Sequence, residues 1–119
     1  MSTAFYSHTD CRLHDMGEGH PECPQRLGAI DDFLYASGLD IALERIDAPL
    51  ADLKDLALAH TSRYVSELHE LLEQVEASGE RRMMDPDTVA NGGTWKAALR
   101  AAGAAVAATD AVIDGRFKN

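Results

Sequence analysis

The sequence predicts an α/β fold that is mostly helical and carries one or two short strands. Three observations lead to this class. A short β-prone run opens the chain, a loop-rich segment follows it, and apolar residues then recur at helical spacing in several longer segments. No internal repeat, linker or low-complexity tract interrupts the 119 residues, so we expect one structural unit over residues 1–119.

The first half of the chain predicts strand, loop, helix and strand in that order. Thr3–Tyr6 is the β-prone run, and residues 7–25 are dense in His, Asp, Cys, Gly and Pro, which predicts a loop. A helix is expected from Pro24 to about Ser37, because Pro suits a first turn and a glycine follows as a left-handed stop. Its apolar residues at helical spacing are Leu27, Ile30 and Leu34. Residues 41–46 are expected to form a second strand.

The second half predicts three helices. A short helix is expected over residues 52–59, and a longer one from Thr61 or Ser62, either of which can cap it, to Gly79. Residues 80–93 are predicted as loop, and an alanine-rich helix should span residues 94–114. Its small side chains should allow close approach to a neighbour. The candidate core residues of the two long helices are Tyr64, Leu68, Leu71, Leu72, Val75, Trp95, Leu99, Ala102, Val106, Val112 and Ile113.

The charge balance narrows the classes of partner. The chain has 11 Lys and Arg against 20 Asp and Glu, a formal net charge of −9, so direct binding to nucleic acid phosphates is not expected. A basic peptide or an amine is favoured electrostatically. No uncharged stretch approaches membrane-spanning length, and the N-terminus lacks the basic and apolar regions of a signal peptide. We therefore expect a cytoplasmic protein with no membrane contact, whose Cys11 and Cys23 are free thiols.

Four side chains of the first loop have metal-binding chemistry. Cys11, His14, His20 and Cys23 spell C-x2-H-x5-H-x2-C, and all four residue types ligate zinc. The gap between the two pairs is short for closing a tetrahedral site, and Pro21 stiffens it. The sequence therefore favours ordinary loop residues over a metal site.

Two carboxylates in the second loop suggest a different chemistry. Asp85 and Asp87 form a D-x-D-x-T/V sequence, with Val89 at the last position, that resembles the phosphoryl-transfer motif of the haloacid dehalogenase superfamily. In that motif one carboxylate attacks phosphorus and the other transfers protons. That motif follows a buried apolar strand, whereas Arg81 and Arg82 lie close before it here, and Pro86 separates the carboxylates. Phosphoryl transfer is therefore the least favoured reading of this loop.

An ordered series of motifs resembles the N-terminal part of the histone deacetylase superfamily, in particular its bacterial deacetylases and acetylpolyamine amidohydrolases. The motifs are Gly19-His20-Pro21-Glu22 with Pro24 and Arg26, then His60 with Tyr64-Val65, then Asp85, Asp87 and Thr88, and last the alanine-rich helix that ends in Asp114-Gly115. The resemblance implies the open parallel α/β fold shared with arginase. It also implies a zinc-dependent amidohydrolase that converts an acetylated amine or acetyl-lysine to acetate and free amine.

The resemblance also assigns roles to individual residues. Asp87 matches a rim aspartate whose carboxylate accepts hydrogen bonds from substrate amides, and Arg26 matches an arginine beside the internal channel for acetate. His20, Pro21 and Glu22 match the first rim loop and are expected to shape the substrate site.

The family's zinc ligands and catalytic histidines lie beyond the matched part, so no catalytic or metal-ligating residue is expected in this chain. We expect an N-terminal segment of one deacetylase domain that is inactive alone. The alternative is a small, mainly helical binding or regulatory module without catalysis.

Overall fold

Two parallel strands joined by a helix form the first unit of the fold. In the computed structural model, which describes residues 2–119, β1 (Thr3–Ser7) pairs with β2 (Leu43–Asp47) in register from Thr3 opposite Leu43 to Ser7 opposite Asp47. Parallel strands need a long crossover connection, and α1 (Gln25–Ser37) with the 3-10 turn η2 (Leu39–Ala42) provides it. Gly38 ends α1 at φ 73°, as expected for a left-handed stop.

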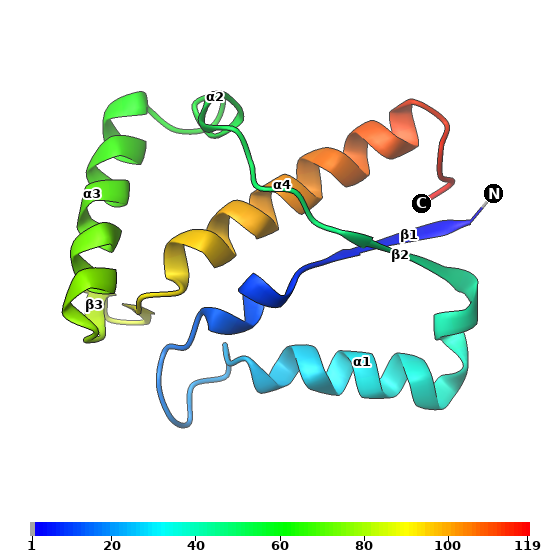
Figure 1. Ribbon diagram of the computed structural model, residues 1–119, viewed down its shortest axis with the longest axis horizontal. Helices are drawn as coiled ribbons and strands as arrows, with labels where there is room; N and C mark the ends of the chain where they lie inside the picture. The colour runs from blue at the N-terminus through cyan, green and yellow to red at the C-terminus, as the bar shows by residue number, and fades with distance from the viewer. Residues whose placement is uncertain (1) are drawn as a thin grey trace.

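The second edge of β1 is also paired. The backbone nitrogen of Ala4 donates to the carbonyl oxygen of Asn119 over 2.9 Å, and that of Lys118 donates to the oxygen of Ser2 over 3.3 Å. The residues after the last helix therefore return to β1, and both termini lie at the same end of the molecule (Figure 1).

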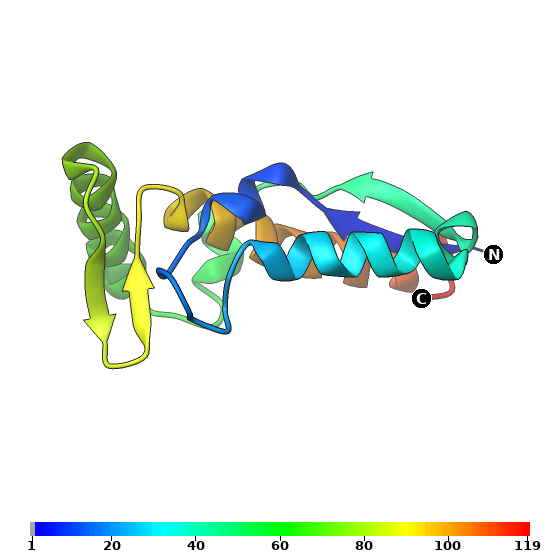
Figure 2. The ribbon, with the colours of Figure 1, turned by 90° about the horizontal axis from the view of Figure 1, so that it is seen from below.

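Three helices build the second half, as the periodicity predicts. They are α2 (Leu53–Leu56), which is shorter than expected, α3 (Ser62–Ser78) and α4 (Thr94–Ile113). The Thr61 side chain caps α3 by accepting from the backbone nitrogen of Tyr64, and Gly79 ends it at φ 69°. Figures 1 and 2 show α4 running beside the strands, with α3 at the end of the molecule opposite the termini. Among residues 2–119, every helix is too short or too polar to span a lipid bilayer.

Two segments predicted as loop are partly regular. Residues 80–93 contain an antiparallel hairpin of β3 (Arg82–Asp85) and β4 (Thr88–Ala90), and residues 9–13 form the 3-10 turn η1 (Thr9–Leu13). The prediction of a loop was wrong at the hairpin because β3 is exposed along its whole length, so it has no alternation of apolar and polar residues to signal a strand. In η1, the His8 Nδ1 atom accepts from the backbone nitrogen of Asp10 and fixes the first turn.

The close approach of α4 to its neighbour is confirmed. Gly103 is buried, and a Cβ atom there would overlap the carbonyl oxygen of Pro49 and lie 2.8 Å from the backbone nitrogen of Ala51. That nitrogen donates to the carbonyl oxygen of Leu99 over 3.0 Å, so the helix backbone itself binds the connection between β2 and α2.

The core is small and does not include every residue predicted for it. The buried apolar residues are Ala48, Val65, Leu72, Val75, Ala90, Ala97, Ala111 and Phe117. Four predicted core residues are exposed instead: Tyr64, Val106, Val112 and Ile113. Their periodicity marked apolar helix faces correctly, but the described residues place no element over these parts of α3 and α4. The imidazole of His69 stacks on Trp95 with ring centroids 4.5 Å apart and joins the two helices.

Candidate substrate-rim site

Two loops distant in sequence meet beside the hairpin turn. The Nε2 atom of His20, in the first loop, lies 3.2 Å from the Oδ1 atom of Asp87, in the turn between β3 and β4. The Asp87 side chain is 95% exposed and that of His20 is 23% exposed. The structure therefore brings together two of the predicted rim residues, with a carboxylate facing solvent between the loops.

The hydrogen bonds of His20 determine where its proton lies. The backbone nitrogen of Glu22 donates to His20 Nδ1 over 3.0 Å, so Nδ1 acts as an acceptor and carries no proton. A neutral imidazole then has its proton on Nε2, which donates to Asp87. Glu22 itself accepts from Arg26 over 3.1 Å, which connects the loop to the first turn of α1. Pro21, the remaining predicted rim residue, is exposed beside them.

Asp85 stabilises the hairpin turn. Its Oδ1 atom accepts from the backbone nitrogen of Asp87 over 2.8 Å. This bond, with a second from the Thr88 hydroxyl, lowers the pKa of Asp85 below its ordinary value. The Asp85 carboxylate thus binds backbone and side-chain groups of its own turn, at the end of an exposed strand. The phosphoryl-transfer motif instead needs its carboxylate at the end of a buried strand.

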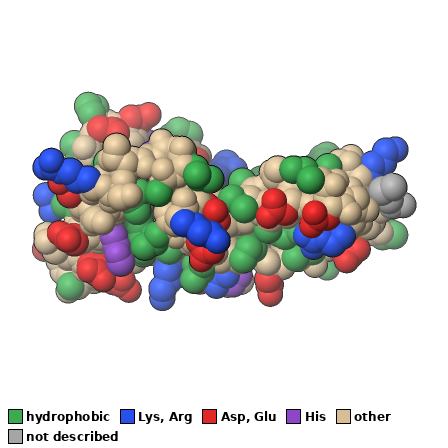
Figure 3. Space-filling view, turned by 90° about the horizontal axis from the view of Figure 1, so that it is seen from above, with side chains coloured by type: hydrophobic (Ala, Val, Ile, Leu, Met, Phe, Trp, Pro, Cys, Tyr) green, Lys and Arg blue, Asp and Glu red, His purple; other side chains and the backbone are tan. Residues whose placement is uncertain are grey.

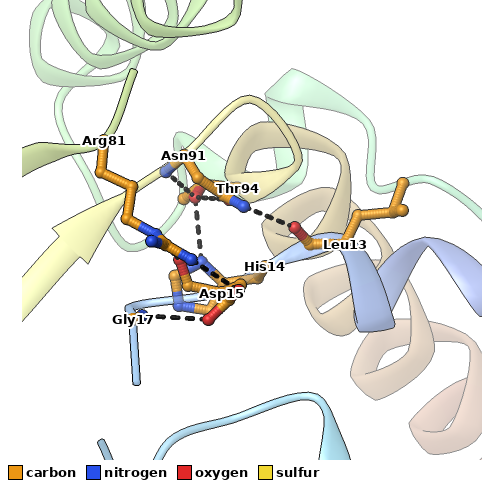
Figure 4. Close-up of polar contacts among 7 residues, drawn as sticks. All are labelled: Leu13, His14, Asp15, Gly17, Arg81, Asn91 and Thr94. Atoms are coloured by element: carbon orange, nitrogen blue, oxygen red, sulfur yellow. Dashed lines mark hydrogen bonds and ion pairs between the residues drawn. The ribbon is translucent and has the colours of Figure 1, made fainter. Parts of the chain in front are cut away.

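An ion pair anchors the middle of the first loop to the residue that precedes β3 (Figure 4). The Arg81 guanidinium donates to Asp15 Oδ2 over 2.7 Å, and the backbone nitrogen of Gly17 donates to Asp15 Oδ1 over 2.9 Å. The bond from Gly17, followed by that from Arg81, lowers the pKa of Asp15. Gly17 has φ 114°, a backbone conformation that only glycine adopts readily.

A second anchor centres on the Thr94 hydroxyl (Figure 4). Thr94 Oγ1 accepts from the backbone nitrogen of Asn91 and donates its single proton to Asn91 Oδ1 over 3.0 Å. His14 Nδ1, at 2.9 Å from the same oxygen, must therefore be a donor. Asn91 Nδ2 donates to the carbonyl oxygen of Leu13 over 2.9 Å, which completes the link.

Sequence reasoning missed Asp15, Arg81, Asn91 and Thr94 as parts of this site. Thr94 is the first residue of α4 and Asn91 lies three residues before it; both are residue types common at the start of a helix, and this was the signal available for them. No local pattern joins Asp15 to Arg81.

A cavity of about 430 Å³ lies between the first loop and α4. Both cysteines, His14 and Arg26 line it, and the alanine-rich face of α4 forms one wall. Arg26, whose side chain is 49% exposed, thus lines a solvent-accessible pocket of the size that binds small molecules.

Cys11, His14, His20 and Cys23 do not assemble into a metal site. No group of three or more His, Cys, Asp or Glu side chains within residues 2–119 is arranged to hold a metal ion. The two histidines form hydrogen bonds with other residues: His14 with Thr94, and His20 with Asp87. Both thiols are free, as expected.

Comparison with known proteins gives a consistent result. The family model described as "Histone deacetylase domain" matches residues 20–119. The chain is 31% identical to Histone deacetylase 5 of Arabidopsis thaliana over 95% of this chain and 18% of that protein. It is 32% identical to Polyamine deacetylase HDAC10 of Rattus norvegicus over 100% of this chain and 21% of that protein. It is 31% identical to Histone deacetylase-like amidohydrolase of Pseudomonas aeruginosa over 85% of this chain and 25% of that protein.

A solved structure, the HDA15 HD domain, matches with a TM-score of 0.85 at 29% identity. The match covers 100% of this chain and 34% of that one. The predicted fold class is thereby confirmed. The chain spans about a fifth of the length of the first curated relatives, which are matched over 18% and 21% of their own sequences.

Proposed function

Since the chain belongs to the histone deacetylase family, we propose that it supplies the N-terminal segment of a zinc-dependent deacetylase. The reaction would hydrolyse acetyl-lysine or an acetylated amine to acetate and free amine. No group of three or more His, Cys, Asp or Glu side chains among residues 2–119 fits a zinc site, and the metal ligands and the catalytic base are proposed to lie outside this chain. The part assigned to this chain is substrate binding at the rim.

One observation supports this role most directly. The Asp87 carboxylate is held by His20 through Oδ1 and remains exposed, which leaves Oδ2 available to accept a hydrogen bond from an N–H group. An ionised carboxylate is purely an acceptor, so it suits an amide or amine N–H of the substrate and repels anionic ligands. The net charge of −9 favours the same class of substrate.

Arg26 is proposed to attract the acetate product. It lines the cavity, and its guanidinium suits a carboxylate. The hydrogen bond from Arg26 to Glu22 uses only one of the five N–H donors of the guanidinium, so the other N–H groups can bind a second carboxylate. The names of the relatives fit the proposed substrate classes, since they include a polyamine deacetylase and a histone deacetylase.

The test uses acetate release from acetyl-lysine peptide and N-acetylated polyamine. Residues 1–119 alone, supplied with zinc, should show no turnover, because the described residues 2–119 contain no group of side chains placed to hold a metal ion. A hybrid that joins this chain to the part of the Pseudomonas aeruginosa amidohydrolase beyond its matched region should turn over, and a chelator should abolish the activity.

Variants of that hybrid test whether Asp87 binds the substrate at the rim. Asp87→Ala should raise KM, whereas Glu70→Ala, which removes an exposed carboxylate on α3, should leave KM unchanged. Robust turnover by residues 1–119 alone would contradict the assignment of catalysis to other residues. A folded, zinc-loaded hybrid that releases no acetate would contradict the proposed function.

A further inference from the structure

His20 is the link between the first loop and the hairpin turn at the exposed carboxylate. We propose that His20 is a positioning residue, which holds the Asp87 carboxylate in one orientation through a neutral, Nε2-protonated imidazole. The expected effect of His20 on KM rests on the proposed function. The tautomer of His20 and its contact with Asp87 can be measured without an activity assay.

Two separate contacts restrain Asp87. Asp85 fixes its backbone nitrogen, and His20 fixes one oxygen of its side chain. A side chain that is 95% exposed would otherwise sample several rotamers, and ordering it at the moment of binding would weaken affinity. With Oδ1 held, the orientation of Oδ2 is set before a substrate arrives.

His20 can restrain Asp87 because His20 is itself restrained. Its Nδ1 atom accepts from the backbone nitrogen of Glu22, and the Glu22 side chain is paired with Arg26 on α1. The imidazole is only 23% exposed, so it is held more firmly than the carboxylate it contacts. A continuous set of hydrogen bonds therefore runs from α1 to the hairpin turn.

The protonation state of the link affects the charge of the rim. A neutral donor orients the carboxylate without cancelling its negative charge, whereas Lys or Arg at this position would neutralise it. The rim consequently keeps its attraction for a cationic amine or a basic peptide. A neutral histidine at position 20 thus orients the Asp87 carboxylate and leaves its negative charge in place.

A matched pair of substitutions separates the two nitrogen atoms of His20. His20→Gln places an amide N–H near the position of Nε2 and can still donate to Asp87. His20→Asn places its side-chain oxygen near Nδ1 and can still accept from Glu22, but it does not reach Asp87. In the hybrid enzyme, His20→Asn should raise KM about fivefold with little change in kcat, which is the effect of losing one ordinary hydrogen bond. His20→Gln should restore most of the lost affinity.

A double variant tests whether His20 acts through Asp87. His20→Asn added to Asp87→Ala should raise KM no further than Asp87→Ala alone. Equal effects of His20→Asn and His20→Gln, or an additive double variant, would overturn the inference.

Nitrogen NMR of the 119-residue chain measures the tautomer directly. In mildly alkaline buffer the His20 ring should show a protonated Nε2 and an unprotonated Nδ1, and the amide of Asp87 should shift in His20→Asn but not in His20→Gln. A ring protonated on Nδ1 would overturn the inference whatever the hybrid does. If the tautomer is as expected and Asp87→Ala leaves KM unchanged, the rim role in the proposed function fails while the positioning geometry stands.

Discussion

The Asp10 carboxylate joins residues that lie far apart in the sequence. Arg100 of α4 donates from Nε to Asp10 Oδ2 over 2.9 Å and from Nη1 to the carbonyl oxygen of Ala48 over 2.7 Å. The hydrogen bond from Arg100 is the main cause of a pKa of Asp10 below its ordinary value of 3.8. The start of η1, the end of β2 and the middle of α4 are thereby tied together.

This pair predicts a pH dependence of stability. Because the pKa of Asp10 is lower in the folded state, its stabilising effect is complete above the unfolded value and is lost as pH falls through the folded value. Asp10→Asn should lower the denaturant midpoint at neutral pH, and the difference from the wild type should shrink below about pH 4. Urea unfolding followed by circular dichroism at several pH values measures it.

Asp110→Asn is the control for that series. Asp110 is exposed and makes no side-chain hydrogen bond or ion pair with the rest of residues 2–119, so its variant should unfold like the wild type throughout. A difference between Asp10→Asn and the wild type that stays constant down to strongly acid pH would contradict the role assigned to the carboxylate charge.

Residue types in the candidate site were predictable, but their contacts were not. The resemblance to the histone deacetylase superfamily pointed to His20 and Asp87, because the motifs that contain them can be read locally in the sequence. Their contact joins positions separated by 67 residues and depends on how α4 and the first loop pack. The same is true of the bond between Arg81 and Asp15, separated by 66 residues. Long-range polar contacts of this kind leave no periodic signal in a sequence.

At the scale of elements, helices were predicted better than strands. The period of apolar residues and the glycine stops located α1, α3 and α4 to within a residue or two of their ends. The hairpin β3–β4 was missed because β3 is exposed along its whole length and, in β4, only Ala90 is buried, so neither strand shows an alternation of apolar and polar residues. In α4 the periodicity predicted burial of Val106 that the packing does not provide.

Gly103 provides a test of the packing between α4 and the connection after β2. Gly103→Ala should destabilise the fold by about 1–3 kcal/mol, the usual cost of forcing atoms into a filled site, because the new methyl group meets the carbonyl oxygen of Pro49. Thermal or urea unfolding measures the change.

Gly28→Ala in α1 is the matched control. The added Cβ lies 3.5 Å from the end of the flexible Arg12 side chain, and alanine is favoured over glycine inside a helix by about 0.5–1 kcal/mol. The control should therefore be neutral or stabilising. If Gly103→Ala behaves in the same way, α4 is not in close contact with Pro49.

At the scale of the whole molecule, the chain is extended and leaves much apolar surface exposed. Its radius of gyration is 16.0 Å, against about 13.5 Å for a compact domain of this length. Its accessible surface is 7968 Å², against about 6,300 Å² for a folded protein of this mass. The space-filling view shows apolar side chains between charged ones along the length of one face (Figure 3). Leu58 is 87% exposed and Ile113 is 76% exposed, so the turn after α2 and the end of α4 present large apolar side chains to water.

This surface should be detectable in solution. The 119-residue chain should bind a dye that reports exposed apolar surface, and its apparent mass should rise with concentration, because contiguous apolar patches associate. The net charge of −9 opposes association through repulsion, so added salt should promote it. Ile113→Lys should reduce dye binding and association with little loss of stability, because its side chain has few contacts to lose.

Leu72→Ala tests whether the dye binds to exposed apolar side chains of the folded chain or to a partly unfolded core. Leu72 is only 3% exposed, so its truncation should destabilise the chain by about 2–5 kcal/mol and increase dye binding. Opposite effects of the two substitutions on dye binding would show that the exposed faces, and not partial unfolding, bind the dye. Equal loss of stability in Ile113→Lys and Leu72→Ala would instead mean that Ile113 is buried in solution, by self-association or by a different packing of α4.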